Sequence, residues 1–498
     1  MNNLPSSKPQ SKDDLWHRAM RGVTATVIAQ GAKLALNAVS IVVLARLLAP
    51  EDYGLFAMAV AVTGFLEIFR SLGLIEAIVK EPKLEDAQLT ALWMVNAATG
   101  LGLAALTLAL APVLAWFYND PRLLPVTAAL APAFAIAGLS FQHNALLRRE
   151  MRFKVVLAVE VLFIGTSVSV SIAFALLGFG YWSLVAGTLA GETVSTIALW
   201  LAHPWRPSRP ADFGSTGPML RFGLHIQAAN ILAAIPIYLG NILVGHNWGA
   251  VELGFYTRAF NLVFLPLYQL VTSANLLAVP TLSRLRDDPQ RFRAYYLKAL
   301  SLVTHFSMPV SMFLVVMSEE IIALVLGSKW QAATPIFRIL SIVSFALPVG
   351  ESHKWVNIAL GRSHQMLRIS AFVTISFVSA MLISLPWGAI GVAASITVSY
   401  WLVLLPILAY ALHGSPIDYP SLLKTLLRPV LVSLCVGLAL VAYKTNFVGT
   451  TDVAWKTLSL AAMITASTAV AAASAMAGEI NPIRYVGASI RALTRKSK

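Results

Sequence analysis

The chain is dominated by apolar stretches that are long enough to cross a membrane and are separated by short polar connections. A bilayer core about 30 Å thick needs about 20 apolar residues per helix, and fourteen segments of the sequence reach that length. They lie near residues 22–46, 54–79, 88–117, 123–146, 155–178, 181–202, 218–245, 254–283, 297–318, 333–358, 364–385, 388–412, 422–443 and 454–477. With 57% hydrophobic and only 12% charged residues, the chain is not a soluble protein, and we expect an all-α integral membrane fold of about 14 transmembrane helices.

The basic residues are distributed unevenly over the connections between these segments. Of the 37 Lys and Arg residues, 28 lie on the two tails or on alternate connections, and only five lie on the opposite connections. Cytoplasmic loops carry an excess of Lys and Arg, so both termini are predicted to be cytoplasmic. The net charge of +14 is therefore interpreted as a topology signal and as contacts with lipid headgroups, with no nucleic-acid partner.

Two pairs of similar segments indicate an internal duplication. Residues 49–56 match 249–256 at an offset of 200, and residues 177–182 match 385–390 at an offset of 208. We therefore expect two six-helix lobes, related by an axis along the membrane normal. The predicted parts are a cytoplasmic tail (1–21), an N-lobe (22–202), a flexible cytoplasmic linker (203–217), a C-lobe (218–412), helices 13 and 14 (413–477) and a basic cytoplasmic tail (478–498).

Four basic residues remain inside the predicted helices, where a charge is costly and needs a partner, a wet cavity or a function. Polar residues accompany them at helical spacing on the first two helices of each half. This pattern predicts a hydrated, cationic, substrate-binding cavity lined by Gln30, Lys33, Asn37, Arg70, Asn230, Arg258, Asn261 and Arg338.

Other interpretations of these residues stay open. Any single Asn can be a hydrogen-bonding contact between helices. Glu67 and Arg70 are three residues apart and form either a structural ion pair or part of a functional site. Glu67 and Glu192 are candidates for ion coupling, whereas Glu160 and Glu192 either relay protons or are buried and paired.

The four basic residues differ in the charge of the residues next to them on the same helix and in their predicted depth. Lys33 and Arg258 have no acidic residue three or four positions away, which favours a place on the cavity wall. Arg338 is predicted in the cytoplasmic third of its helix, from where its side chain would reach the interface.

Catalytic and cofactor sites are not indicated. The histidines lack metal-ligand spacing, the single Cys435 cannot form an intrachain disulfide, and no phosphate-binding loop is present. Glu51 and Asp52 resemble the acidic loop of membrane glycosyltransferases, but Pro50-Glu51-Asp52 fits a helix start better. No external loop is long enough for a catalytic domain, so we expect neither an enzyme, a cofactor nor a metal.

Four short motifs in order carry a resemblance to a known family. They are residues 46–54, 253–260, 280–285 and 326–330. Over residues 15 to about 445 the chain resembles the polysaccharide transporters, or Wzx-like flippases, of the multidrug/oligosaccharidyl-lipid/polysaccharide exporter superfamily. Its likeness is greatest to the flippases of xanthan-type gum clusters.

The resemblance implies a V-shaped pair of six-helix lobes that work by alternating access. The implied substrate is an undecaprenyl-pyrophosphate-linked oligosaccharide repeat unit, moved across a bacterial inner membrane to the periplasmic leaflet for exopolysaccharide or lipopolysaccharide synthesis. Lys33 and Arg258 would hold the pyrophosphate, with Arg70 and Arg338 secondary. The polymerase and export machinery of the same pathway are candidate partners.

Two further functions stay open. A cation-coupled multidrug antiporter of the same fold would need an acidic residue deep in the N-lobe, for which Glu67 is the nearest candidate. A membrane glycosyltransferase or polymerase is the more distant alternative, because the chain lacks a long acidic external loop.

Overall fold

Helices form all the regular structure of the described residues. The computed structural model describes residues 12–70, 74, 75, 78, 84–208 and 216–446; the predicted helix 454–477 and the tail 478–498 lie outside them. Within this part, eleven helices are long and apolar enough to cross a membrane. Two of them, Ala234–Arg284 and Ser363–Leu412, have 51 and 50 residues and are each long enough to cross twice. The all-α membrane fold is confirmed, and the predicted number of helices is consistent with it.

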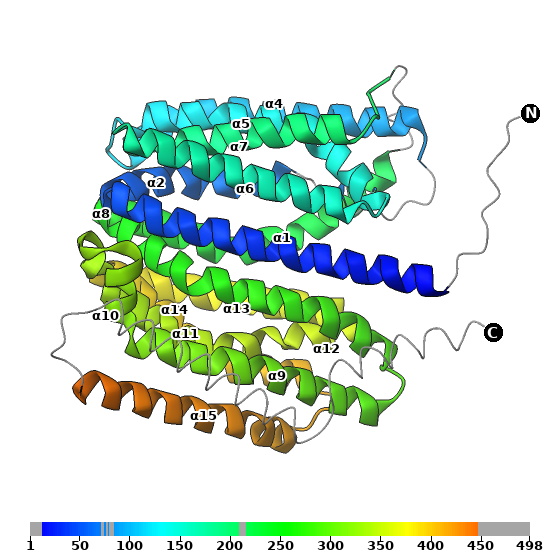
Figure 1. Cartoon of the computed structure of the whole chain (residues 1–498), viewed down its shortest axis with the longest axis vertical. Coiled ribbons are helices and arrows are strands. Elements are labelled where there is room, and N and C mark those ends of the chain that lie inside the picture. Colours follow the sequence, from blue (N-terminus) through cyan, green and yellow to red (C-terminus); the bar gives the residue numbers. More distant parts are fainter. Residues whose placement is uncertain (1–11, 71–73, 76–77, 79–83, 209–215, 447–498) are drawn as a thin grey trace, which may run out of the picture. The chain divides into compact units, whose positions relative to one another are not determined.

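The contacts divide the chain into two compact units, Met1–Gly254 and Phe255–Lys498. The helices of the first unit are α1 (Lys12–Leu47), α2 (Pro50–Glu67), η1 (Ile68–Arg70), α4 (Asp86–Phe117), α5 (Leu123–Arg149), α6 (Phe153–Leu176), α7 (Trp182–Ala202) and the beginning of α8 (Gly217–Arg284). Helix α5 packs between α4 and α7, and α6 packs between α7 and α1 (Figure 1).

The second unit contains the rest of α8 and the helices that follow. They are α9 (Pro289–Val316), α10 (Ser318–Ile321), η2 (Ile322–Leu326), η3 (Ser328–Ala333), α11 (Thr334–Glu351), α12 (His353–Ala359), α13 (Ser363–Ser384), η4 (Leu385–Trp387), α14 (Gly388–Leu412) and α15 (Tyr419–Asn446). Helix α9 packs against α11 and α15, and α14 packs against α11 and α13. The side chains of Phe292, Tyr296 and Trp355 fill the core of this unit.

The compact units do not coincide with the two predicted lobes. Residues 218–254 were assigned to the C-lobe, whereas by their contacts they belong to the first unit. Sequence repetition and compactness are different criteria, so the lobe boundaries at 22–202 and 218–412 stay a prediction.

A single glycine divides α8 where the sequence predicts a loop between 245 and 254. Gly249 has φ 81° and ψ −178°, and the residues on both sides are helical. Glycine adopts this conformation without steric cost, so one residue makes the whole turn. By the offset of 200, Gly249 corresponds to Ala49, the residue before α2.

The second pair of similar segments also has matching local structure. Gly180 and Gly388 are related by the offset of 208, and both have positive φ, 53° and 71°. Gly388 is the first residue of α14, and Gly180 lies two residues before the start of α7. The second sequence match therefore corresponds to turns with similar backbone conformation, which supports the duplication.

Within the first unit, α2 crosses the adjacent part of α8 at the repeat-related glycines. A Cβ atom on Gly54 would lie 1.6 Å from the carbonyl oxygen of Ala250, and one on Gly254 would lie 2.0 Å from that of Pro50. The offset of 200 converts the first contact into the second. Only glycine permits an approach this close.

The outer surface of α15 is apolar, as expected for a helix in lipid. Large side chains at helical spacing point outward along its length: Leu423, Leu427, Leu431, Leu434 and Leu438, which are 48–71% exposed. In water this continuous stripe would be unfavourable, but hydrocarbon solvates it.

The first residues of the predicted flexible linker are bound to helices. His203 accepts a hydrogen bond from the backbone N–H of Trp205 through Nδ1 and contacts Glu150 through Nε2, at 3.1 and 3.0 Å. The backbone N–H of Ser208 donates to Oγ1 of Thr90 at 3.0 Å. Residues 203–208 thus make defined contacts, while 209–215 lie outside the described residues, and the flexible linker stays a prediction.

Candidate substrate-binding site

Lys33 lies in an ion-pair group that joins three helices of the first unit. Its Nζ is 2.8 Å from Oε2 of Glu160 on α6, and Nη2 of Arg148 on α5 is 3.2 Å from Oε1 of the same carboxylate. Asn144 accepts a hydrogen bond of 2.7 Å from Nε of Arg148. We call Lys33, Arg148 and Glu160 the Glu160 group. Of the two alternatives for Glu160, the structure shows the paired one, with a partly exposed carboxylate.

The position of the Glu160 group along the helices can be estimated from both ends. Lys33 precedes Leu47, the end of α1, by 14 residues, and Glu160 follows Phe153, the start of α6, by seven. At 1.5 Å per residue these separations are about 20 and about 10 Å. They add to about the 30 Å of a bilayer core, so the group lies roughly one third of the way in from the predicted cytoplasmic side.

A second group surrounds Arg70 and has the opposite balance of charge. Nη1 of Arg70 is 2.8 Å from Oε1 of Glu67 and 3.1 Å from Oε1 of Glu192 on α7. Glu67 and Glu192 are thus both paired with Arg70, and whether the group is structural or functional stays open. We call these residues the Arg70 group, in which two carboxylates share one guanidinium.

Arg338 lies at the other end of its helix from the predicted one. Its guanidinium donates to Oγ of Ser318 at 2.8 Å and to Glu319 at 2.9 Å, and Glu319 also binds Lys444 at 3.0 Å. The hydrogen bonds from Lys444 and Arg338 lower the pKa of Glu319. Arg338 lies near Thr334, the start of α11, which the predicted topology assigns to the external side and not to the cytoplasmic third of the helix.

The remaining predicted site residues are distributed over both units. Gln30 and Asn37 are half-buried on α1, and Arg258 and Asn261 are half-buried on the part of α8 in the second unit. The side chain of Asn230 falls outside the described residues. Each unit thus holds some of the polar residues that were predicted to bind substrate.

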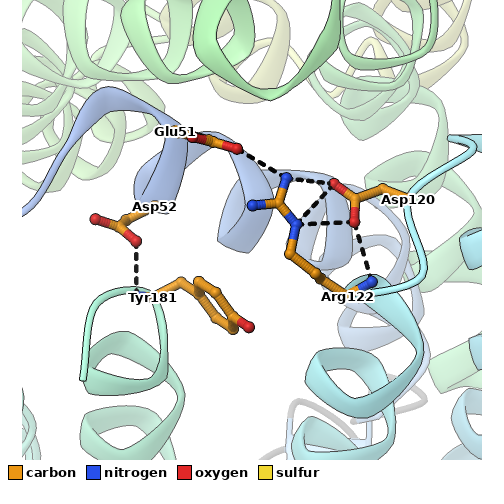
Figure 2. A network of polar contacts seen from close by, with 5 residues as sticks. All are labelled: Glu51, Asp52, Asp120, Arg122 and Tyr181. Carbon is orange, nitrogen blue, oxygen red and sulfur yellow. Dashed lines mark hydrogen bonds and ion pairs between the residues drawn. The ribbon is translucent and has the colours of Figure 1, made fainter.

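A polar network at the end of the first unit that is predicted to be external was not foreseen; we call it the external network (Figure 2). Nη2 of Arg122 is 2.8 Å from Glu51 and 2.7 Å from Asp120, and the hydrogen bond from Arg122 lowers the pKa of Asp120. Asp52 accepts the backbone N–H groups of Ala49 and Tyr181, at 2.9 and 3.0 Å.

This external network links the start of α2 to the turns before α5 and α7. Pro50 is the first residue of α2, with acidic residues directly after it, so the helix-start interpretation is confirmed. The signal in the sequence was that oppositely charged residues occur together on the otherwise weakly charged external connections.

Metal-ligating side chains are not clustered in the described part of the chain. No group of three or more His, Cys, Asp or Glu residues there is arranged to hold a metal ion. The polar groups described above are ion pairs and hydrogen-bonding side chains on the helices.

Comparison with known proteins identifies the family and the fold. The sequence matches the polysaccharide biosynthesis protein family over residues 43–335. The lipopolysaccharide biosynthesis protein WzxC of Escherichia coli (strain K12) is 23% identical over 431 residues, covering 84% of this chain and 86% of that protein.

Two solved structures share the fold at low sequence identity. The lipid II flippase MurJ in an inward closed conformation superposes with a TM-score of 0.70 at 16% identity, covering 91% of this chain and 98% of that one. An inward-facing multidrug resistance MATE family transporter of the MOP superfamily gives 0.65 at 15% identity, covering 77% and 94%. Since the matched region exceeds half of the sequence, the chain belongs to the polysaccharide biosynthesis protein family.

Proposed function

We propose that this protein is a flippase, and not an enzyme, that moves undecaprenyl-pyrophosphate-linked oligosaccharide repeat units from the cytoplasmic to the periplasmic leaflet of a bacterial inner membrane. Transport would proceed by alternating access. The transported repeat units would serve exopolysaccharide synthesis of the xanthan type or lipopolysaccharide synthesis. The polymerase and export machinery of that pathway are its proposed partners, and both termini are cytoplasmic.

The observation that carries the proposal is the excess of positive charge in the Glu160 group. Two cations face one carboxylate there, at a depth where unmatched charge is costly. A positive excess in this environment favours an anionic ligand, and a pyrophosphate supplies several negatively charged oxygens for Lys and Arg. The names of WzxC and MurJ agree with a lipid-linked saccharide as that ligand.

The proposed contacts follow from residue type. Lys33 and Arg258 bind phosphate oxygens, with Arg70 and Arg338 secondary. Arg70 faces two carboxylates, whereas Lys33 shares its single carboxylate with Arg148. The amide groups of Gln30, Asn37, Asn230 and Asn261 hydrogen-bond to sugar hydroxyls.

Transport into membrane vesicles tests these contacts. We expect Lys33→Ala and Arg258→Ala to lower the transport of a lipid-linked oligosaccharide by about tenfold or more, since each removes a charge-assisted hydrogen bond. Lys329→Ala, at an exposed external residue, is the matched control and should transport normally. If both Lys33→Ala and Arg258→Ala transport at the wild-type rate, the site assignment is wrong.

A cation-coupled multidrug antiporter is the second candidate, favoured by the Arg70 group. There Glu67 and Glu192 share one guanidinium, which leaves negative charge for a proton or another cation. Efflux of ethidium from proteoliposomes separates the two functions: an antiporter would export it and lose the activity in Glu67→Gln, whereas the proposed flippase would not export it.

A further inference from the structure

The Glu160 group and the Arg70 group carry opposite excess charge although both lie in the first unit. The Glu160 group has two cations and one carboxylate, and the Arg70 group has one cation and two carboxylates. An anion entering the unit is therefore attracted to the first group and repelled by the second.

Each carboxylate oxygen of Glu160 is occupied by one cation. Oε2 contacts Nζ of Lys33 at 2.8 Å, and Oε1 contacts Nη2 of Arg148 at 3.2 Å. A phosphate group also has neighbouring anionic oxygens, and it accepts the same donors, an ammonium and a guanidinium. The carboxylate thus occupies the place that two phosphate oxygens would take between these helices.

The Glu160 group is open enough for such an exchange. The side chains of Lys33, Glu160 and Arg148 are 25%, 33% and 36% exposed, so none of them is sealed in the protein. Asn144 holds the guanidinium of Arg148 independently of Glu160, through a hydrogen bond of 2.7 Å. The cation would therefore keep its position after the carboxylate moves away.

We propose that Glu160 is the resident counter-ion of a phosphate subsite formed by Lys33 and Arg148, and that a phosphate group of the lipid-linked substrate displaces it. This inference rests on the proposed function, because it concerns the same substrate. In the empty protein Glu160 compensates the two cations at membrane depth. When substrate is bound, the displaced carboxylate competes with the phosphate and promotes its release.

The subsite gives Arg148 and Glu160 roles that the sequence did not indicate. Arg148 is one of the basic residues on the connections that are predicted to be cytoplasmic. Glu160 is a positioning residue, since it acts through the two cations and does not contact the bound phosphate.

Binding of undecaprenyl pyrophosphate to the full-length protein in phosphatidylcholine nanodiscs tests the exchange. Glu160→Gln keeps the size and the polar character of the side chain but removes its charge. We expect this variant to bind about tenfold more tightly than wild type and to release the ligand more slowly, whereas Arg148→Gln binds more weakly. A residue that only supported the structure would not tighten binding when replaced.

Two variants serve as controls for charge and for a general effect of carboxylate removal. Glu160→Asp keeps the charge and should bind like wild type. Glu351→Gln removes a carboxylate that pairs with Lys354 at 2.6 Å in the second unit, and its affinity should be unchanged. Thermal melting confirms that each variant is folded; should Glu160→Gln not fold, wild-type affinity in Arg148→Gln would still overturn the inference.

Titrations with other phosphate compounds identify which kind of molecule supplies the phosphate group. Inorganic pyrophosphate and phosphatidylglycerol replace the lipid-linked ligand in parallel titrations. If Glu160→Gln raises the affinity for phosphatidylglycerol alone, the site is an ordinary lipid site and the proposal is overturned. Unchanged or weaker binding of undecaprenyl pyrophosphate would also overturn it. If wild type translocates the oligosaccharide but Glu160→Gln does not bind more tightly, only this inference fails; if folded wild type neither binds nor translocates, the proposed function fails.

Discussion

At the residue scale, the absence of a side chain at Gly54 permits α2 to touch the backbone of α8. A Cβ atom there would lie 1.6 Å from the carbonyl oxygen of Ala250, and neither backbone can move without disturbing its helix. We expect Gly54→Ala to destabilise the protein by about 1–3 kcal/mol, the usual range for overpacking. Thermal unfolding in detergent measures the change.

Gly102→Ala is the matched control for this prediction. Gly102 also lies inside a helix, α4, but no atom lies within 4 Å of its Cβ position. Alanine is the better helix former, so this variant should melt at the wild-type temperature or slightly above it. Equal melting of Gly54→Ala and Gly102→Ala would show that the helices do not cross as described.

The sequence predicted individual site residues better than their partners. Lys33 was recognisable because a charge inside an apolar helix is costly. Its partner Glu160 is 127 residues away, and no spacing rule for one helix connects residues so distant. Arg148 was missed for a different reason, since its place near a helix end made it look like one more topology charge.

At the element scale, Arg122 of the external network joins the ends of two helices, α2 and α5. The guanidinium binds Glu51 at the start of α2 and Asp120 in the turn before α5 (Figure 2). Arg122→Gln should lower the unfolding free energy at neutral pH by about 0.2–1 kcal/mol for each pair, since the arginine is partly exposed. Thermal unfolding at several pH values measures this loss.

The pH dependence of the effect has a defined sign. Arg122 lowers the pKa of Asp120 below its ordinary value of 3.8. A lowered pKa in the folded state contributes stability above pH 3.8 and loses it only as the pH falls through the lowered value. The difference between wild type and Arg122→Gln should therefore be constant from pH 8 to about pH 5. A difference that disappeared within this range would contradict the assignment of Asp120 as the partner.

Helix boundaries were predictable where the chain changes polarity and less so where it bends. Apolar runs located the helices because about 20 residues are needed to cross a bilayer. Gly249, in contrast, turns the chain within one residue, whereas the sequence predicts a longer loop between residues 245 and 254. The proline content of residues 203–208 predicts a flexible linker. In the structure His203 contacts Glu150, which is distant in the sequence.

At the scale of the whole molecule, the predicted orientation is open to a direct test. Cys435 is replaced by Ser, and single cysteines are introduced at Asn119 or Lys329 on the predicted external side and at Arg291 on the cytoplasmic side. A membrane-impermeant maleimide added to spheroplasts should label the first two positions and not the third. If only Arg291→Cys is labelled, the topology is the inverse of the predicted one, and so is the direction of transport.

The class of the molecule followed from the sequence because lipid imposes a strong pattern on any chain that crosses it. The duplication was also visible, and in the structure its matched glycines make equivalent turns and reciprocal contacts. The position of Arg338 near the start of α11 is harder to predict, because the depth of a side chain depends on the direction in which its helix crosses the membrane. Its partners Ser318 and Glu319 lie in the connection that is predicted to be external.

The most direct test of the account is translocation by the purified protein in liposomes. An undecaprenyl-pyrophosphate-linked oligosaccharide is placed in both leaflets, and an impermeant glycosidase reports how much of it reaches the outer one. We predict that wild type exposes the inner pool, that protein-free liposomes do not, and that Lys33→Gln slows exposure by about tenfold or more. A folded wild-type protein that leaves the inner pool protected would contradict the account.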